Sequence, residues 1–277
     1  LRYTPPHQTP MSMTESTQSL GEDTLPKRSL IEELFCLRGR VALVTGSTRG
    51  LGYAMAEVLL SAGASVVIHG RDTERASSAA EQLEKRVHAR GQLVYGQRAV
   101  GLGARLGEPG CCQLLVDRVL DSLGRLDILV NNAGINIRAS AHEQRDEDWA
   151  SILQVNCTAV MQLTRAAYPA LRKSGLGRVV MLGSMISFVS MPHIGAYALS
   201  KGGVLMYAKT LALEWASDGI TVNVLCPGVF ATDMNSDIVD DTALLDKIPL
   251  RRWGKPQDLQ GAVLLLASDA GSYITGQ

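Results

Sequence analysis

The chain has 277 residues, of which 46% are hydrophobic, and this length is typical of one large domain with a single core. Lys plus Arg and Asp plus Glu both number 27, so the formal net charge is zero. This balance argues against nucleic acid and anionic membranes as partners, and no apolar run approaches the roughly 20 residues of a membrane helix.

The cysteines indicate a reducing compartment. They are odd in number, and none lies in a CxxC motif or a His/Cys cluster with metal-ligand spacing. The N-terminus also lacks the basic start and apolar core of a signal peptide. We therefore expect a cytoplasmic protein with no metal site and with free thiols at Cys36, Cys111, Cys112, Cys157 and Cys226.

Two regions follow one another along the chain. The N-terminal segment is rich in Pro, Ser, Thr and Gln without an apolar period, so we predict a disordered arm over residues 1–35. Over residues 36–277, short β-branched runs alternate with longer helical patterns, which predicts a single doubly wound α/β domain of the Rossmann type. Its parallel sheet is expected to carry helices on both faces. The five β-branched runs are RVALVTG, SVVIHG, LDILVNNAG, RVVMLGS and ITVNVLCPG.

The first of these strands leads into a glycine-rich turn. Gly46, Gly50 and Gly52 follow VALVT with the spacing G-x3-G-x-G and precede a helical pattern. Glycines let the backbone approach a pyrophosphate, which then lies against the free N–H groups at the start of the helix. The turn predicts a dinucleotide site, the alternative being an ordinary tight connection.

The end of the second strand bears on cofactor choice. It reads His69, Gly70, Arg71 without an acid at its tip, and Arg49 lies inside the glycine turn. An acid there would favour NAD, whereas two guanidinium groups suit the 2′-phosphate of NADP. We therefore predict NADP. NAD stays open, because Asp72 could bind a ribose and both arginines could be solvated surface residues.

Tyr197 and Lys201 stand at positions i and i+4 of a helical run, so they share one face of the helix. A nearby cation is expected to lower the pKa of the phenol, making it a useful general acid/base. Ser184, at the carboxyl edge of the sheet, could hold a substrate oxygen against Tyr197. Asn156, polar in an apolar stripe, could order a water that relays protons beyond Lys201. Each residue alone also fits a purely structural role.

Together these motifs resemble the classical short-chain dehydrogenases/reductases, over about Leu34 to Gln277. The serine, the tyrosine thirteen residues later and the lysine four further on carry the resemblance, with TGSTRGLG, LDILVNNAG and CPGVFATDM. It implies hydride transfer between nicotinamide and a carbonyl or secondary alcohol, with a catalytic tetrad of Asn156, Ser184, Tyr197 and Lys201. It also implies a homo-oligomer, a tetramer or dimer, assembled through helices at about 146–172 and 196–217.

The resemblance further implies which residues bind the cofactor. The glycine turn and Arg71 would hold the phosphates, and the segment after the fourth strand would contact the adenosine ribose. Lys201 would bind the nicotinamide ribose, and the segment after the sixth strand would bind the carboxamide. The full set is Gly46, Ser47, Arg49, Gly50, Leu51, Gly52, Arg71, Asn132, Ala133, Gly134, Tyr197, Lys201, Pro227, Gly228, Val229 and Thr232.

The chain departs from the family in two places within this domain. After the third strand, YGQRAVGLGARLGEPGCC is rich in glycine and arginine, and Arg105 stands near the place of the family's adenine-binding aspartate. Adenine recognition must therefore differ, or the segment is irregular. The sequence also stops at SYITGQ, so we expect the seventh strand of the family's sheet to be missing.

The substrate is expected to contact the loop after Thr232 and a cleft lined by Met185, Ile186, Ile137, Arg138 and His193. LFCLRGRVALVTGS, NNAGINIR and GSMISF resemble the gluconate 5-dehydrogenase-like branch, whose substrate would be a sugar acid or polyol. The alternatives are a 3-oxoacyl-[acyl-carrier-protein] reductase-like enzyme, an NADP-sensing protein without turnover, and a scaffold with a vestigial site.

Overall fold

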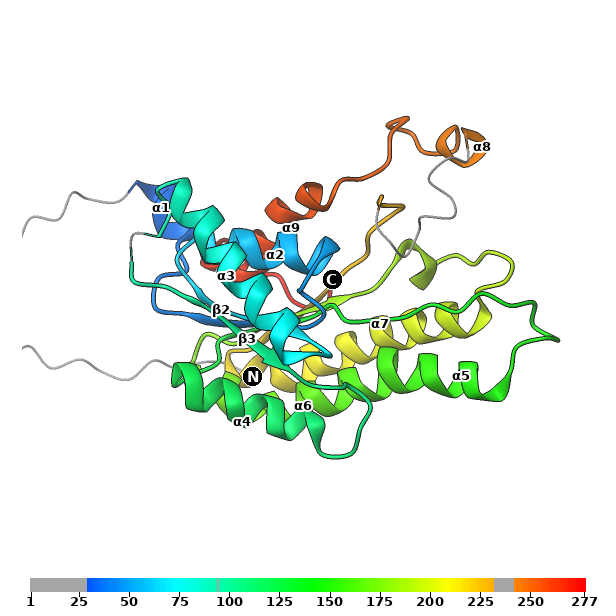
Figure 1. Cartoon of the computed structure of the whole chain (residues 1–277), viewed down its shortest axis with the longest axis horizontal. Coiled ribbons are helices and arrows are strands. Elements are labelled where there is room, and N and C mark those ends of the chain that lie inside the picture. Colours follow the sequence, from blue (N-terminus) through cyan, green and yellow to red (C-terminus); the bar gives the residue numbers. More distant parts are fainter. Residues whose placement is uncertain (1–28, 94, 232–241) are drawn as a thin grey trace, which may run out of the picture.

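The computed structural model describes residues 29–93, 95–231 and 242–277 (Figure 1). Helix α1 (Leu30–Phe35) lies inside the arm that we expected to be disordered up to residue 35, so that prediction is wrong for residues 29–35. The cause is a capping box, in which the Ser29 hydroxyl accepts the Glu32 N–H and the Glu32 carboxylate accepts the Ser29 N–H. Residues 1–28 and Thr232 lie outside the described residues.

The sheet confirms the predicted doubly wound architecture. Its six parallel strands lie in the order β3-β2-β1-β4-β5-β6. The chain reverses its direction of travel across the sheet between β3 and β4, so β1 and β4 are neighbours and a crevice opens at their carboxyl ends. The strands are β1 (Val41–Val44), β2 (Ser65–Gly70), β3 (Ala99–Gly103), β4 (Ile128–Asn131), β5 (Arg178–Leu182) and β6 (Thr221–Leu225).

Helices cover both faces of this sheet (Figure 1). On one face lie α2 (Gly50–Ser61), α3 (Thr73–Ala89) and α9 (Gln260–Ala267), and on the other α4 (Cys111–Leu123), α6 (Ala159–Ser174) and α7 (Gly195–Trp215). Strands β1, β4 and β5 are buried along their whole length, because both of their faces meet helices. Among the described residues, no helix is long and apolar enough to cross a membrane.

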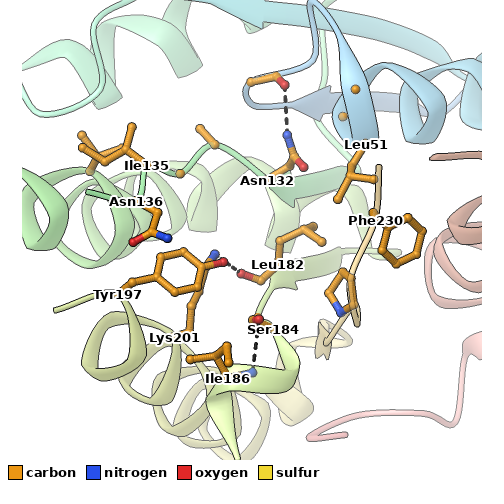
Figure 2. Close-up of a pocket in the computed structure, with 18 of the residues that line it drawn as sticks. Leu51, Asn132, Ile135, Asn136, Leu182, Ser184, Ile186, Tyr197, Lys201 and Phe230 are labelled. Carbon is orange, nitrogen blue, oxygen red and sulfur yellow. Dashed lines mark hydrogen bonds between the residues drawn. The ribbon is translucent and has the colours of Figure 1, made fainter. Parts of the chain in front are cut away.

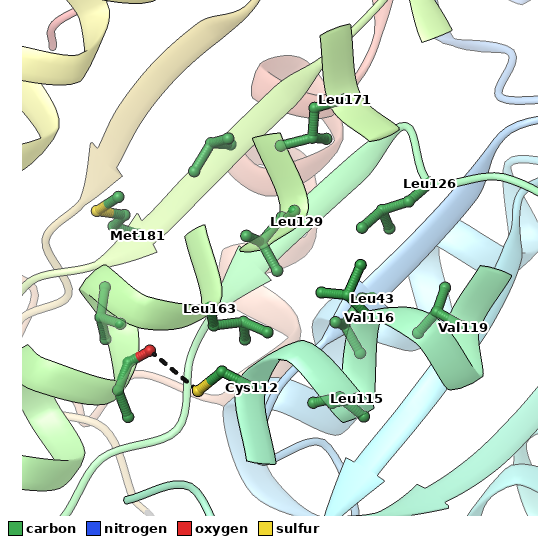
Figure 3. Close-up of a cluster of buried hydrophobic side chains, with 14 of the residues drawn as sticks. Leu43, Cys112, Leu115, Val116, Val119, Leu126, Leu129, Leu163, Leu171 and Met181 are labelled. Carbon is green, nitrogen blue, oxygen red and sulfur yellow. Dashed lines mark hydrogen bonds between the residues drawn. The ribbon is translucent and has the colours of Figure 1, made fainter. Parts of the chain in front are cut away.

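Figure 3 shows the core between the sheet and the second group of helices. Leu43 and Leu129 of the central strands meet Leu115 and Val116 of α4 and Leu163 of α6, all at most 1% exposed. Each fully buried leucine contributes about 1.5–3 kcal/mol relative to an exposed one. This packing fixes the strand ends that carry the site.

The glycine-rich third strand is regular. A Cβ on Gly101 would lie 2.2 Å from the backbone nitrogen of Ser77, and one on Gly103 would lie 2.3 Å from Thr73 Oγ1. Helix α3 packs so closely on β3 that any larger residue would push the two apart. Gly101 and Gly103 make this strand hard to recognise in the sequence, and both are required by its packing against α3.

The predicted helix at 146–172 is interrupted. Helix α5 (Asp146–Leu153) passes through one π-helical turn, η1 (Gln154–Thr158), into α6. A π turn inserts an extra residue into the helical ladder and is frequent at functional sites. Here it contains Asn156, one of the four residues predicted to be catalytic.

The outer edge of β6 is contacted by the end of the chain. Gly276 N–H donates to Val222 O at 2.8 Å, and Val224 N–H donates to Gln277 O at 2.7 Å. The described residues form a six-stranded sheet, and the last two residues of the given sequence extend its hydrogen bonding along β6.

Candidate active site

A cavity of about 1110 Å³ lies at the carboxyl ends of the strands. Its walls come from the glycine turn, the segment after β4, the end of β5, the start of α7 and the segment after β6. The structure therefore brings together residues spread over more than 180 positions of the chain. The predicted site residues on its walls are Gly46, Arg49, Gly50, Leu51, Gly52, Arg71, Asn132, Ala133, Gly134, Ser184, Tyr197, Lys201, Pro227, Gly228 and Val229.

Among the described residues predicted to be catalytic or to bind the cofactor, Ser47 and Asn156 are not on the walls. Ser47 is fully buried, and its hydroxyl donates to Val44 O at 2.6 Å and accepts the His69 N–H at 3.0 Å. Its side chain therefore ties β1 to β2 and does not line the cavity, and contact of Ser47 with a cofactor stays a prediction. Asn156 is 1% exposed and lies behind the wall.

The glycines of the turn have conformations and contacts that a larger residue would not tolerate. Gly46 and Gly50 have φ of +62° and +61°, which favours glycine. A Cβ on Gly52 would lie 2.5 Å from both Asn132 Nδ2 and Gly46 O. Arg49 precedes α2 without a side-chain capping bond, and Gly50, Leu51 and Gly52 at the start of α2 line the cavity.

Thr45, which the sequence analysis did not single out, positions the segment after β4. Its hydroxyl oxygen accepts the backbone N–H groups of Asn132 and Ala133, both at 3.0 Å. The Asn132 amide in turn donates to Thr45 O at 2.7 Å and Gly46 O at 3.0 Å. These bonds lock the segment after β4 against the glycine turn.

Tyr197 and Lys201 lie side by side on α7 (Figure 2). The ammonium is 5.7 Å from the centre of the phenol ring and donates to Leu182 O, at the end of β5, at 2.6 Å. Lys201 is only 5% exposed, and this burial lowers its pKa to about 8. The ammonium is thus held in place by the sheet, with its charge next to the cavity.

The expected lowering of the tyrosine pKa is wrong for this structure. Burial raises the pKa of Tyr197 above its ordinary value of 10.0, and a hydrogen bond with Ser184 opposes this only in part. Burial outweighs the neighbouring groups because a phenolate loses its hydration in the cavity wall. Near neutral pH the hydroxyl is therefore protonated and able to donate.

Two serines shape the turn after β5. Ser184 accepts the Ile186 N–H at 3.2 Å and so begins the short helix η2 (Met185–Ser187), which places its hydroxyl on the cavity wall (Figure 2). Ser187, missed in the sequence, accepts the Ser184 N–H at 3.2 Å and donates to Lys201 O at 2.9 Å. It connects the turn to the helix that carries Tyr197 and Lys201.

Asn156 holds the segment beside these residues. Its Oδ1 accepts the Ile135 N–H at 2.8 Å, and its Nδ2 donates to Ile135 O at 2.9 Å and to Ser200 Oγ at 3.1 Å. A Cβ built on Gly134 would lie 3.3 Å from Asn156 Oδ1 and 3.7 Å from Lys201 Nζ. The amide and the ammonium thus both border Gly134, and the water-ordering role of Asn156 stays a prediction.

The residues predicted to line a substrate cleft are only partly at the cavity. Met185, Ile186 and Arg138 line it, but Ile137 and His193 do not. His193 adopts φ of +66°, and its carbonyl accepts the Ala139 N–H at 3.0 Å, which directs its side chain to Ser140 at 3.3 Å. The described residues contain no group of three or more His, Cys, Asp or Glu that could hold a metal ion.

Comparison with known proteins is consistent with this geometry. The family model for short chain dehydrogenases matches residues 40–243. The 3-oxoacyl-[acyl-carrier-protein] reductase of Haemophilus influenzae is 37% identical over 242 residues, which cover 87% of this chain and 95% of the relative.

Solved structures are similar throughout the domain. The gluconate 5-dehydrogenase of Burkholderia cenocepacia, in complex with NADP and tartrate, has a TM-score of 0.82 at 35% identity and covers 89% of this chain and 95% of its own. The 3-oxoacyl (acyl-carrier-protein) reductase of Agrobacterium tumefaciens, with NADP bound, has a TM-score of 0.82 at 33% identity. The match covers 91% of this chain and 96% of that structure's chain.

Proposed function

This chain belongs to the short-chain dehydrogenases, and we propose that it reduces a carbonyl group, or oxidises the corresponding secondary alcohol, with NADP as cofactor and Tyr197 as general acid/base. Membership of the family makes it an oxidoreductase. The observation that carries the proposed mechanism is the cavity that joins the glycine turn to Tyr197, Lys201 and Ser184.

The roles of the three side chains follow from their geometry. The Ser184 hydroxyl, at the end of β5, would hold the substrate oxygen, and Tyr197 would give that oxygen its proton. Lys201, fixed by Leu182 O, would stabilise the phenolate that remains. Because burial keeps Tyr197 protonated near neutral pH, the resting state suits carbonyl reduction.

The walls of the cavity fit a phosphorylated dinucleotide. The close packing of Gly52 against Gly46 O and Asn132 brings the start of α2 to the cavity wall, where its N–H groups would meet a pyrophosphate, and Arg49 and Arg71 line the same cavity. When bound, the nicotinamide supplies or accepts the hydride. Two guanidinium groups in this cavity favour NADP, which the structures of two relatives also contain.

The double variant Arg49→Ala/Arg71→Ala tests the phosphate site. We expect NADP affinity to fall by about 100-fold, because two charge-assisted hydrogen-bond donors are lost, while NAD affinity changes by less than about 3-fold. Calorimetric titration measures both, and Arg75→Ala on the exposed side of α3 is the control. Equal losses for NADP and NAD would refute the assignment of these arginines to the 2′-phosphate.

For the substrate, we propose a sugar acid or a related polyol. Arg138 on the cavity wall would bind the carboxylate, and Lys247, which follows α8 (Thr242–Leu245), is a second cationic residue lining the same cavity. The runner-up is a 3-oxoacyl thioester, since 3-oxoacyl-[acyl-carrier-protein] reductases are similar to the chain over 87% of its length. A cofactor sensor without turnover is disfavoured by the intact Tyr197 and Lys201.

Oxidation of NADPH by the wild-type protein tests this function. Keto acids, sugar ketones and 3-oxoacyl thioesters are supplied in turn, and the loss of reduced nicotinamide is followed by absorbance. We expect the keto sugar acids to react fastest. Fastest turnover of thioesters would select the runner-up, and tight NADPH binding without turnover of any carbonyl would point to a sensor.

We also propose a homo-oligomer assembled through α7. Leu199, Met206 and Leu213 are 52%, 61% and 84% exposed and recur every seven residues, so they form one apolar stripe.

The double variant Met206→Glu/Leu213→Glu should shift a dimer or tetramer to the monomer in light scattering. Leu250→Glu, at an equally exposed residue outside α7, should not. A monomeric wild type, or an unchanged mass for the double variant, would contradict this interface.

The state of the thiols supports a cytoplasmic protein. All five cysteines are free, and even the adjacent Cys111 and Cys112, with sulfur atoms 3.8 Å apart, are buried thiols. Burial and its neighbour raise the pKa of Cys112 to about 12, so it is not a reactive thiolate. We propose that these cysteines serve packing in a reducing compartment.

A further inference from the structure

His69, at the end of β2, joins two walls of the cavity. It is 2% exposed, its Nδ1 lies 3.2 Å from the Gly46 N–H donor, and its Nε2 lies 3.1 Å from Ala104 O. A carbonyl oxygen only accepts, so Nε2 carries the hydrogen and Nδ1 accepts from Gly46. One imidazole thus bridges the glycine turn and the segment that follows β3.

That second segment, residues 104–108, is fixed at both ends. Ala104 N–H donates to Gly70 O at 2.9 Å, and Gln154 of the π turn donates to Gly107 O at 3.0 Å. Between these anchors the segment turns back on itself, with Glu108 N–H donating to Arg105 O at 3.1 Å. It presents Arg105, Leu106 and Glu108 to the cavity.

The place of this segment relative to the glycine turn indicates which part of a ligand it meets. Strand β3 is separated from β1 by β2, so its carboxyl end lies on the side of the turn away from Tyr197 and Ser184, which come from α7 and the end of β5. A dinucleotide whose nicotinamide lies at Tyr197 and whose phosphates lie at the turn must place its adenosine here.

We propose that His69 is a positioning residue for the adenosine half of the dinucleotide, because it sets the distance between the glycine turn and the 104–108 segment that would enclose the base. This rests on the proposed dinucleotide function. His69 itself contacts both walls through hydrogen bonds, and Leu106 supplies the apolar surface against which a base could lie.

The protonation state of the ring is consistent with this role. Burial lowers the pKa of His69 to about 4, so the imidazole is neutral near neutral pH. A second ring hydrogen would sit on Nδ1 and face the Gly46 N–H, and the bridge would break. The bridge therefore requires the neutral tautomer that the geometry shows.

Three variants separate the bridge from simple packing. His69→Phe fills the space without either bond. His69→Asn places an amide oxygen near the position of Nδ1 and can keep the Gly46 bond, whereas His69→Gln places an amide nitrogen near that of Nε2 and can keep the Ala104 bond. His88→Phe, on the exposed side of α3, is the matched control.

Binding of NADP, NAD and 2′,5′-ADP is measured by calorimetry, with turnover at saturating NADPH as a second readout. We expect His69→Phe to weaken all three ligands about 10- to 100-fold and the two amide variants to weaken them about 2- to 10-fold, as one or two hydrogen bonds are lost. NADP and NAD should be affected equally, and saturated turnover should stay within about 2-fold, because Tyr197 is remote.

Wild-type affinity in all His69 variants would overturn the proposal, as would weaker binding in His69→Phe alone with unchanged binding in both amide variants. A fall in saturated turnover as large as the fall in affinity would show a general structural role and also overturn it. These outcomes differ from a failure of the proposed function, in which the wild type itself would not bind NADP.

Discussion

Tyr197→Phe is expected to lower kcat by about 1000-fold while NADP affinity changes by less than about 3-fold. The variant removes one oxygen and leaves the ring, which packs beside Lys201 with 5.7 Å between the ammonium and the ring centre. It therefore removes the proton donor without emptying the wall of the cavity. Steady-state kinetics give kcat, and calorimetric titration gives the cofactor affinity.

Tyr207→Phe is the matched control for this result. Tyr207 lies on the same helix and is half-buried, but it does not line the cavity. It should keep full turnover. If Tyr197→Phe retained the wild-type kcat, another group would have to supply the proton, and the tyrosine would be removed from the mechanism.

Lys201→Met is expected to abolish turnover and to change how stability depends on pH. Burial lowers the pKa of Lys201 from 10.5 to about 8, so the unfolded chain binds more protons than the folded chain between those values. The cost of burying the charge is fully present below pH 8 and disappears as the pH rises toward 10.5. This cost is about 3 kcal/mol.

The difference in free energy of unfolding between wild type and Lys201→Met isolates this effect. The difference is measured by chemical denaturation at about pH 7 and pH 10. The free energy of unfolding of the wild type should rise relative to that of Lys201→Met by about 2–3 kcal/mol at the higher pH. Lys209→Met, at an exposed residue of the same helix, should show no such shift. A pH-independent difference for Lys201→Met would mean that the buried amine does not titrate as the structure indicates.

Much of the fold was predictable because its strands and helices leave local patterns in the sequence. The alternation of short β-branched runs with helical patterns gave the parallel sheet, and the four-residue step from Tyr197 to Lys201 placed both side chains on one helical face. The third strand was harder to recognise. Its glycines at 101 and 103 reflect contact with α3, which belongs to the tertiary structure and has no local period.

The parts of the site that could not be predicted depend on contacts between distant segments. His69 gains its role from Gly46 and Ala104, and the latter is 35 residues away. Ser47 lies in the recognisable turn, but the closeness of β1 and β2 directs its hydroxyl to Val44 and away from the cavity. The direction of the Tyr197 pKa was missed for the same reason, because the extent of burial is set by packing around the whole cavity.

The central claim is that Tyr197 protonates a carbonyl oxygen while a hydride reaches the carbonyl carbon. Transfer of deuterium from NADPH labelled at its transferable position, followed by mass spectrometry of the product, tests it most directly. The account predicts one deuterium on the new CH–OH carbon for the wild type and almost none for Tyr197→Phe over the same time. An unlabelled alcohol from the wild type, or equal labelling by both proteins, would contradict it.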